Sequence, residues 1–219
     1  MIRNGKRLLL IGVIFILLFV LWTLLIQTID VQVAGQTEAE VGFATLNCCF
    51  HKFTGVHMSV YYITDWLGLL PVFICMVFAV LGLTQLVSRK SLIKVDFDIL
   101  LLGIYYVIVI FCYLVFEMVQ INYRPILIEG FREASYPSST TLLVLSVMPT
   151  LIFQINRRLK NLMIKKIIIF SVMTFSIFMV IGRLISGVHW FTDIVGSVLL
   201  SAGMFCVYKA IVLIYNKEN

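Results

Sequence analysis

Three ionisable side chains stand close together between two apolar stretches near the end of the chain. In the segment GRLISGVHWFTD, Arg183 is followed six residues later by His189 and four further on by Asp193. Charged groups beside hydrocarbon are costly unless they are paired or used. A helix would bring Asp193 to the same face as His189, where its carboxylate can fix one imidazole nitrogen and leave the other to attack. The spacing therefore predicts a nucleophilic histidine.

Two other segments carry residues that suit an anionic substrate. Asn122-Tyr123-Arg124-Pro125 adds a second arginine, and guanidinium groups bind phosphate oxygens bidentately and stabilise transition-state charge. Tyr136-Pro137-Ser138-Ser139-Thr140 is typical of a helix start, where free backbone N–H groups favour anions. Together with the first segment, these residues favour phosphoryl transfer.

Each segment also has an ordinary structural explanation. A serine pair at a helix start is most often a cap, and a histidine and an aspartate at helical spacing are more often a polar pair than a catalytic one. Arg183 on its own is compatible with an anchor at the membrane interface. The functional interpretation therefore depends on whether the fold brings the three segments together.

The composition indicates an integral membrane protein. Of the 219 residues, 61% are hydrophobic and 13% charged, whereas a soluble domain has roughly 45–50% and about 25%. Apolar stretches of about 20 residues are long enough to cross a bilayer. We expect an all-α bundle, a single domain over 1–219, with spans at about 8–27, 65–87, 98–120, 137–155, 167–183 and 189–215.

The placement of the basic residues predicts the topology. Lys and Arg gather at the amino terminus, in 88–94, in 156–166 and around Lys217, and six spans put all four on one side. Basic short loops mark the cytoplasmic face. We therefore expect a multi-pass plasma membrane protein with both termini cytoplasmic and the three segments at the outer face. The net charge of +6 is explained in this way, so nucleic acid is not expected as a partner.

The sequence also gives predictions for the connector 28–64, for transport and for cofactors. A short interfacial helix is predicted within 41–60. A transporter is disfavoured because no charged residue lies mid-span. The three histidines lack the close spacing of a ligand pair, and no glycine-rich nucleotide loop precedes a helix, so neither a metal nor a nucleotide cofactor is predicted.

These segments resemble the three motifs of the type 2 phosphatidic acid phosphatase family, within the lipid phosphatase and acid phosphatase superfamily. The motifs K-x6-R-P, P-S-G-H and S-R-x5-H-x3-D are matched by EMVQINYRP, PSST and GRLISGVHWFTD, and the resemblance extends from about residue 60 onward. It implies a helical bundle with a metal-independent site near the outer leaflet. The implied roles are a phosphohistidine on His189, oriented by Asp193, and phosphate binding by Arg124, Arg183, Ser138 and Ser139.

Three positions depart from the family pattern. Glu117 stands for the lysine, Gly182 for the serine, and Thr140 for the histidine that protonates the leaving oxygen. A positioned general acid contributes roughly 10²–10⁴-fold. A lipid pyrophosphate, whose leaving group needs little protonation, would avoid this loss. Alternatively Glu117, kept protonated by burial, donates the proton.

Simpler explanations of the same residues also stand. Glu117 would pair with Arg124, and His51 and His57, which could reach over the site, would be surface residues. The expected function is a phosphatase for a lipid phosphate or pyrophosphate. Undecaprenyl pyrophosphate, phosphatidylglycerol phosphate and phosphatidic acid are the substrates that the resemblance implies. The alternative is a lipid-phosphate-binding pseudophosphatase of the same fold.

Overall fold

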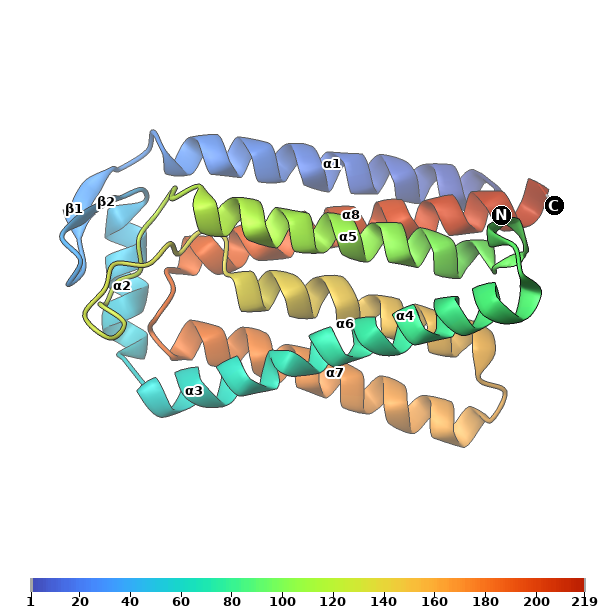
Figure 1. The fold of residues 1–219 in the computed structure, drawn as a ribbon. Helices are drawn as coiled ribbons and strands as arrows, with labels where there is room; N and C mark the ends of the chain where they lie inside the picture. Colours follow the sequence, from blue (N-terminus) through green and yellow to red (C-terminus); the bar gives the residue numbers. More distant parts are fainter. Residues whose placement is uncertain (1, 219) are drawn as a thin grey trace.

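The computed structural model describes residues 2–218, and the side chains of 4–215. Within that part of the chain, six helical stretches are long and apolar enough to cross a membrane, and they lie side by side in one bundle (Figure 1). The expected six-span all-α fold is therefore confirmed. The helices that contribute to these stretches are α1 (Ile2–Ile26), α3 (Met58–Leu67), α4 (Leu69–Arg89), α5 (Phe97–Met118), α6 (Ser139–Arg158), α7 (Leu162–Ile185) and α8 (Phe191–Glu218).

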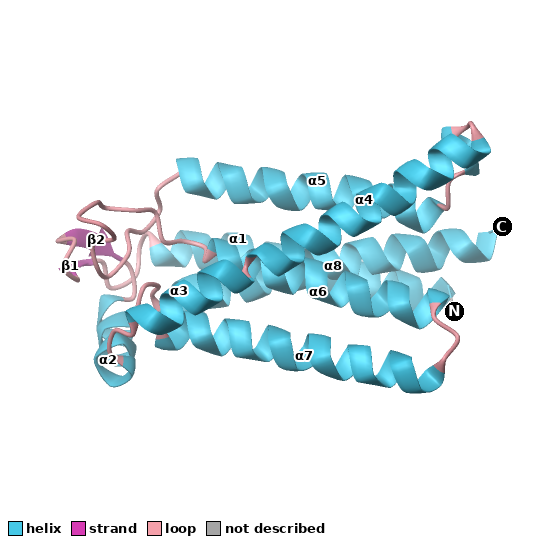
Figure 2. Cartoon of the chain, turned by 60° about the horizontal axis from the view of Figure 1, so that its bottom comes forward, coloured by secondary structure: helices cyan, strands magenta, loops and turns pink. Residues whose placement is uncertain are grey.

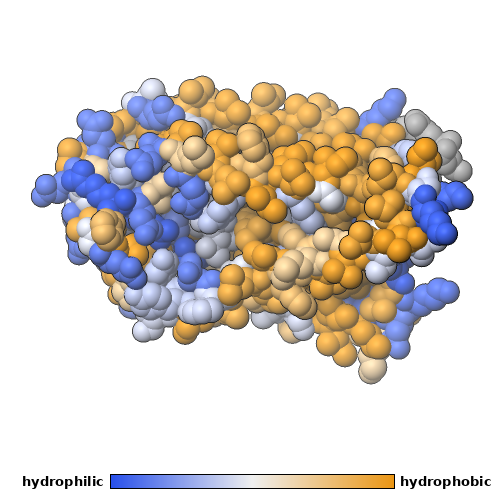
Figure 3. All heavy atoms as spheres, viewed as in Figure 1, coloured by the Kyte–Doolittle hydropathy of each residue, from blue (hydrophilic) through white to orange (hydrophobic). Residues whose placement is uncertain are grey.

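An apolar band covers the middle of the bundle, and polar residues gather at its two ends (Figure 3). The helices satisfy their own backbone hydrogen bonds, which a bilayer requires of any spanning segment. Two of them form the centre: the most apolar stretches of α6 and α8 are each 44% buried within the bundle, against 17% for α1. The residues that α6 and α8 carry are therefore the ones most enclosed by protein.

The second span begins earlier than expected. We predicted a start at Asp65, but α3 begins at Met58 and continues into α4 through Gly68, which keeps a helical conformation. Figure 2 shows α3 and α4 crossing the bundle as one long diagonal rod. Pro71 lies in the first turn of α4, close to Gly68 where α3 ends, and proline is tolerated at this position. The added turns of α3 bring further side chains to the end of the bundle where α7 joins α8.

The connector between α1 and α3 is partly helical, as predicted. Helix α2 (Ala44–Thr54) lies within the predicted segment. A two-stranded antiparallel hairpin precedes it, formed by β1 (Gln32–Ala34) and β2 (Ala39–Val41). The sequence analysis did not predict this hairpin. Both elements cap the end of the bundle that carries the α5–α6 and α7–α8 connections (Figure 1).

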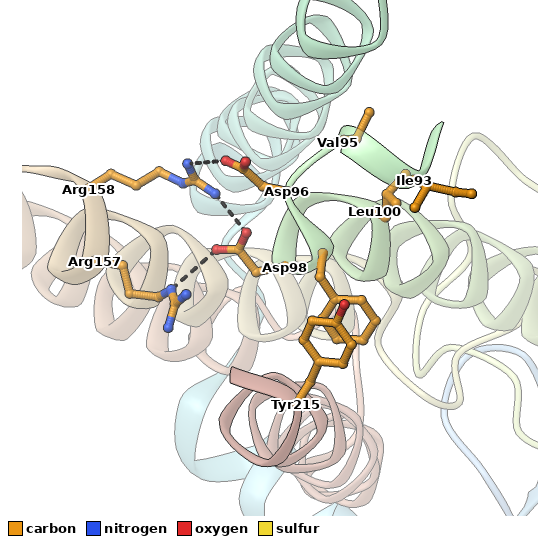
Figure 4. A pocket seen from close by; sticks show the side chains of 9 residues that line it. Ile93, Val95, Asp96, Asp98, Leu100, Arg157, Arg158 and Tyr215 are labelled. Atoms are coloured by element: carbon orange, nitrogen blue, oxygen red, sulfur yellow. Dashed lines mark hydrogen bonds and ion pairs between the residues drawn. The ribbon is translucent and has the colours of Figure 1, made fainter. Parts of the chain in front are cut away.

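An ion-pair cluster closes the opposite end, where both termini lie (Figure 1). Asp98 in the first turn of α5 accepts hydrogen bonds from Arg157 Nε at 3.2 Å and Arg158 Nη2 at 2.8 Å (Figure 4). Asp96 accepts from Arg158 and from Arg89 at 3.0 and 2.8 Å. Burial raises the pKa of Asp96, but the arginine hydrogen bonds outweigh it and hold this pKa at about 2.

The predicted basic segments lie at the same end of the bundle as this cluster. The connection between α4 and α5, with the 3-10 turn Leu92–Lys94, and the connection between α6 and α7 both stand at this end. The basic residues of 88–94 and 156–166 thus share one face, as their placement in the sequence predicted. The side chains of Arg3 and Lys217, which the sequence analysis counted with them, lie outside the described residues.

Candidate active site

The connection between α7 and α8 positions the three ionisable residues of the GRLISGVHWFTD segment. Arg183 lies in the last turn of α7, His189 in the short connection that follows, and Asp193 in the first turn of α8. Their exposed fractions are 1%, 3% and 0%. Burial of three such groups in one place, at the end of a membrane helix pair, is expensive unless they bond to one another.

His189 is held by Ser135 and only indirectly by Asp193. Its Nδ1 lies 3.1 Å from the carbonyl oxygen of Ser135, but 3.7 Å from the Asp193 carboxylate. A carbonyl oxygen only accepts, so Nδ1 carries the ring proton. The Ser135 hydroxyl donates to Asp193 and lies 3.3 Å from Nδ1. The expected direct hydrogen bond from His189 to Asp193 is therefore replaced by one that passes through Ser135.

The other imidazole nitrogen carries no proton and faces Arg183. Nε2 of His189 accepts a hydrogen bond from Arg183 Nη2 at 3.3 Å. Burial first, and then the positive charges of Arg124 and Arg183, lower the pKa of His189 well below its usual range, against the raising effect of the Ser135 carbonyl. The imidazole is thus neutral near pH 7, with a lone pair that faces a guanidinium group. A phosphate bound by that guanidinium would meet this lone pair.

The two arginines approach one another against a single aromatic ring. The guanidinium carbon of Arg183 lies 5.0 Å from the centre of the Tyr61 ring and that of Arg124 lies 5.7 Å from it. Both distances are within the range of a cation–π interaction. Nη1 of Arg124 and Nε of Arg183 are buried and have no hydrogen-bond partner among the described residues. Buried donors that have no protein partner, contributed by two arginines, are expected where a protein binds an anion.

Each arginine has a carboxylate partner, and neither partner is Glu117. Arg124 pairs with Glu133, at 3.1 Å between Nε and Oε2 without hydrogen-bond alignment. Arg183 pairs with Asp65 at 3.5 Å. The expected pairing of Arg124 with Glu117 is therefore wrong. Glu133 takes that place because the α5–α6 connection folds back on itself, and the Arg124 N–H donates to the Glu133 carbonyl.

Glu117 lies exposed in the last turn of α5. The protein itself does not enclose this side chain, and its role as a proton donor stays a prediction. Its side chain nevertheless lines the cavity described below together with both arginines. It also lines a void of about 10 Å³ beside His189, and this volume is about that of one water molecule.

The Pro-Ser-Ser-Thr segment starts a helix as predicted, but its first serine does not face the site. The Ser138 hydroxyl is fully buried and donates to Thr141 Oγ1 at 3.0 Å, and its N–H donates to the Asp193 carbonyl at 3.3 Å. The expected role of Ser138 as a direct phosphate ligand is therefore not supported. Ser139 and Thr140 do line the cavity, at the end of α6 where the first N–H groups lack intrahelical acceptors.

A cavity of about 830 Å³ opens beside the arginines. One part is polar and ionic, and the other is lined by aliphatic side chains of α4, α5 and α6, namely Leu69, Val72, Ile110, Leu114 and Leu143. Val72 and Ile110 also line a second, apolar groove of about 590 Å³ that continues between α4 and α5. The arrangement suits a ligand with an anionic head and a hydrocarbon chain.

Several contributors were missed by the sequence analysis. Ser135, Tyr61 and Asp65 belong to no recognised motif, and no local pattern marks them. Gly182 has a structural explanation: a Cβ atom there would lie 2.7 Å from Thr64 Cγ2, so the glycine lets α3 pack closely on α7. His51 Nε2 donates a hydrogen bond to the Gly187 carbonyl at 3.1 Å.

His51 thus supports the turn before His189 from α2, rather than reaching into the cavity. His57 is exposed and bonds to the Thr54 carbonyl within its own segment, at 2.9 Å. Neither histidine lines the cavity.

Comparisons with known proteins identify a family and support the fold. A family model described as the PAP2 superfamily matches residues 104–217, slightly more than half of the chain. Among solved structures, the chain is similar to the first transmembrane PAP2 type phosphatidylglycerolphosphate phosphatase from Bacillus subtilis, with a TM-score of 0.64. The two share 18% identity over 92% of this chain and 96% of that one, which supports a common fold. No curated protein sequence matches the chain.

Proposed function

Because this chain belongs to the PAP2 superfamily, we propose that it hydrolyses a lipid phosphate or pyrophosphate in the membrane through a phosphohistidine on His189. One observation carries the proposal. Nδ1 of His189 is held by the Ser135 carbonyl at 3.1 Å, which leaves Nε2 beside the Arg183 guanidinium at 3.3 Å. A neutral nucleophile and a phosphate ligand thus adjoin in one buried site.

The reaction uses the surrounding groups in two steps. The lone pair of Nε2 attacks phosphorus, the bond to the leaving oxygen breaks, and Arg124 and Arg183 stabilise the charge on the phosphoryl oxygens. Water then attacks the phosphohistidine and releases phosphate. Loss of one preorganised donor to a transition-state oxyanion costs about 10²–10³-fold in rate in other enzymes, and we expect each arginine to contribute at that level. The chemistry requires no metal.

The shape of the cavity supports a lipid as substrate. The aliphatic wall that includes Val72 and Ile110 leads from the arginines into the apolar groove between α4 and α5. We propose undecaprenyl pyrophosphate, phosphatidylglycerol phosphate and phosphatidic acid as the lipids to test. The pyrophosphate has the better leaving group, which matters because Thr140 replaces the family's proton donor.

The proposed orientation places the site on the extracytoplasmic side of the plasma membrane. It rests on the basic segments 88–94 and 156–166, which lie at the opposite end of the bundle from His189 (Figure 1). Short basic loops are retained in the cytoplasm. Both termini lie at that basic end, so the proposal makes them cytoplasmic.

A second candidate function is favoured by the departures at two motif positions. Thr140 cannot donate a proton at neutral pH. Glu117 adds a negative charge to the cavity, where it would repel a phosphate group. A pseudophosphatase would use Arg124 and Arg183 to hold a lipid phosphate with little or no turnover. The two functions differ in what His189 does after the lipid has bound.

Phosphate release by the purified protein in detergent tests the proposal. Undecaprenyl pyrophosphate, phosphatidylglycerol phosphate and phosphatidic acid are offered separately with EDTA present, and His189→Ala is the matched control. We expect release with the wild-type chain, none with His189→Ala, and acid-labile, base-stable label on the protein from a ³²P substrate. Full hydrolysis by His189→Ala would exclude the mechanism. Lipid binding by both proteins without release would establish the pseudophosphatase.

A further inference from the structure

Asp65 is the carboxylate that pairs with the buried Arg183 guanidinium. Its Oδ1 lies 3.5 Å from Nη1 of Arg183, whereas His189 Nε2 lies 3.3 Å from Nη2 of the same guanidinium. The nucleophile and this carboxylate therefore stand at the two terminal nitrogens of one arginine. On the basis of the phosphohistidine mechanism proposed above, we infer that Asp65 protonates the leaving oxygen in place of the family's missing histidine.

The positions of His189 and Asp65 are compatible with the in-line geometry that phosphoryl transfer requires. Attack and departure occur on opposite sides of phosphorus. A nucleophile begins about 3–3.5 Å from the atom it attacks, and a general acid must come within about 2.6–3.2 Å of the leaving oxygen. A phosphate that bridges the two terminal nitrogens of Arg183 would have His189 at one nitrogen and Asp65 at the other, so its leaving oxygen would point toward the carboxylate when His189 attacks.

The carboxylate also lies near the position of the family's missing histidine. Gly68 follows Asp65 by three residues and packs on Thr140: a Cβ atom on Gly68 would lie 3.2 Å from Thr140 Cγ2. Asp65, Gly68, Thr140 and Arg183 all line the 830 Å³ cavity. The last turn of α3 therefore brings a carboxylate to the side of the cavity where Thr140 stands in place of the histidine.

Asp65 is easily released from its present partner. Its distance of 3.5 Å to Arg183 is long for a charge-assisted hydrogen bond, which is about 2.7–2.9 Å. Its side chain is 56% exposed, whereas that of Arg183 is 1% exposed. Substrate phosphate can therefore take the guanidinium while the carboxylate swings toward the leaving oxygen at little cost.

The two other carboxylates in the cavity are less well placed. Glu133 is engaged with Arg124 at 3.1 Å, on the other arginine. Glu117 lines the large cavity too, but it also lines the small void together with His189 and Ser139, which places it nearer to the nucleophile. Asp65 is absent from that void and present in the large cavity.

The proton balance closes without another reactant. A phosphate monoester that binds as its monoanion brings one proton, which passes to the Asp65 carboxylate. As the P–Nε2 bond forms and the ester P–O bond breaks, Asp65 gives that proton to the leaving oxygen and the alcohol departs. In the second step Asp65 takes a proton from the water that attacks phosphorus, and the P–Nε2 bond breaks. Asp65 then returns this proton to the phosphate, which leaves as its monoanion, and the carboxylate and the neutral imidazole are regenerated.

The dependence of rate on the leaving group tests this role. Asp65→Asn keeps the size of the side chain but cannot carry the proton. We expect kcat/KM for phosphatidic acid, which has an alkoxide leaving group, to fall by roughly 10²–10⁴-fold. For p-nitrophenyl phosphate, whose leaving group needs no proton, we expect a much smaller change. Asp65→Glu should restore part of the phosphatidic acid activity.

Glu133→Gln is the matched control, because it removes the other carboxylate that pairs with a phosphate-binding arginine. It should change both substrates by similar factors. Adding Thr140→His to Asp65→Asn should recover phosphatidic acid hydrolysis. Equal losses on both substrates, or no loss on either, would overturn the role of Asp65 while leaving the phosphohistidine mechanism intact. No turnover by the wild-type chain with any phosphate would instead defeat the proposed function on which the inference rests.

Discussion

The Nδ1 atom of His189 hydrogen-bonds to the backbone of Ser135 at 3.1 Å, across 54 residues of sequence. The same serine links the imidazole to Asp193 through its hydroxyl. The carbonyl fixes the tautomer, because it can only accept. The Asp193 carboxylate lies one hydrogen bond further from the imidazole. Ser135 therefore orients the ring, whereas Asp193 would stabilise the positive charge that the ring acquires in the proposed reaction.

Ser135→Ala should separate these functions. The variant keeps the carbonyl and therefore the tautomer, but it removes the hydroxyl between His189 and Asp193. We expect kcat to fall less than in Asp193→Ala, with KM little changed. Asp193 would lose one of its buried donors, which costs about 1–3 kcal/mol of stability. Steady-state kinetics and thermal unfolding in detergent measure both effects, and a loss as large as that of Asp193→Ala would contradict the division.

The lowered pKa of His189 predicts a loss of stability in acid. The unfolded histidine titrates near 6.5, but the folded one stays neutral well below that value. As the pH falls below about 6.5, His189 becomes protonated in the unfolded chain but not in the folded chain. The free energy of unfolding therefore falls by up to about 1.4 kcal/mol per pH unit. The stability that His189 contributes is fully present above this pH. It decreases as the pH falls from about 6.5 to the pKa of the folded histidine, and below that pKa it decreases no further.

Thermal unfolding of the wild type and of His189→Asn at about pH 7.5 and about pH 5.5 measures this effect. The unfolding midpoint of the wild type should fall more steeply than that of the variant, which retains His51 and His57. Parallel pH dependences would show that His189 accepts a proton in the folded chain.

Tyr61 should act on phosphate binding through its ring rather than its hydroxyl. The ring lies 5.0 and 5.7 Å from the guanidinium carbons of Arg183 and Arg124. Cation–π contacts are worth about 1–2 kcal/mol when partly desolvated, a factor of roughly 5–30. Tyr61→Leu should therefore raise KM and the inhibition constant of inorganic phosphate by that factor, while Tyr61→Phe should match the wild type. If Tyr61→Phe is as impaired as Tyr61→Leu, the hydroxyl is the group that matters.

The sequence was sufficient for the features that depend on local pattern. Apolar stretches predicted the six spans, and the spacing of Arg183, His189 and Asp193 indicated the candidate site. Ser135, Tyr61 and Asp65 could not be predicted, because their roles arise from tertiary contacts with residues 54, 122 and 118 positions away. The pairing of Arg124 with Glu133 was missed for a related reason. It depends on the path of the α5–α6 connection, which hydrophobic periodicity does not encode.

Asp98→Asn should weaken the fold without changing the chemistry. Asp98 is 5% exposed and accepts from Arg157 and Arg158 at the end of the bundle opposite the site. Hydrogen bonds to a charged group contribute about 1.5–3 kcal/mol, so the unfolding midpoint should fall clearly. Asp96→Asn is the comparison, and its effect should be smaller because that side chain is 31% exposed. Phosphate release below the unfolding range should be unchanged in both, and a large loss would show that the two ends are coupled.

Glu117→Lys should strengthen anion binding, because it restores the cation that the family pattern has at this position. The cavity is lined by Arg124 and Arg183 on the positive side, and by Glu117 and two further carboxylates on the negative side. Reversing one charge removes a repulsion and adds an attraction to phosphate, and both are screened because Glu117 is exposed.

We therefore expect KM for phosphatidic acid to fall by roughly tenfold at low ionic strength and by much less in about 1 M salt. Glu117→Gln should lie between the wild type and Glu117→Lys. With Asp65 as proton donor, kcat should persist in both variants, whereas a collapse of kcat in Glu117→Gln would identify Glu117 as the acid. If KM is the same in the wild type and in both variants, the phosphate binds too far from Glu117 for the carboxylate to repel it.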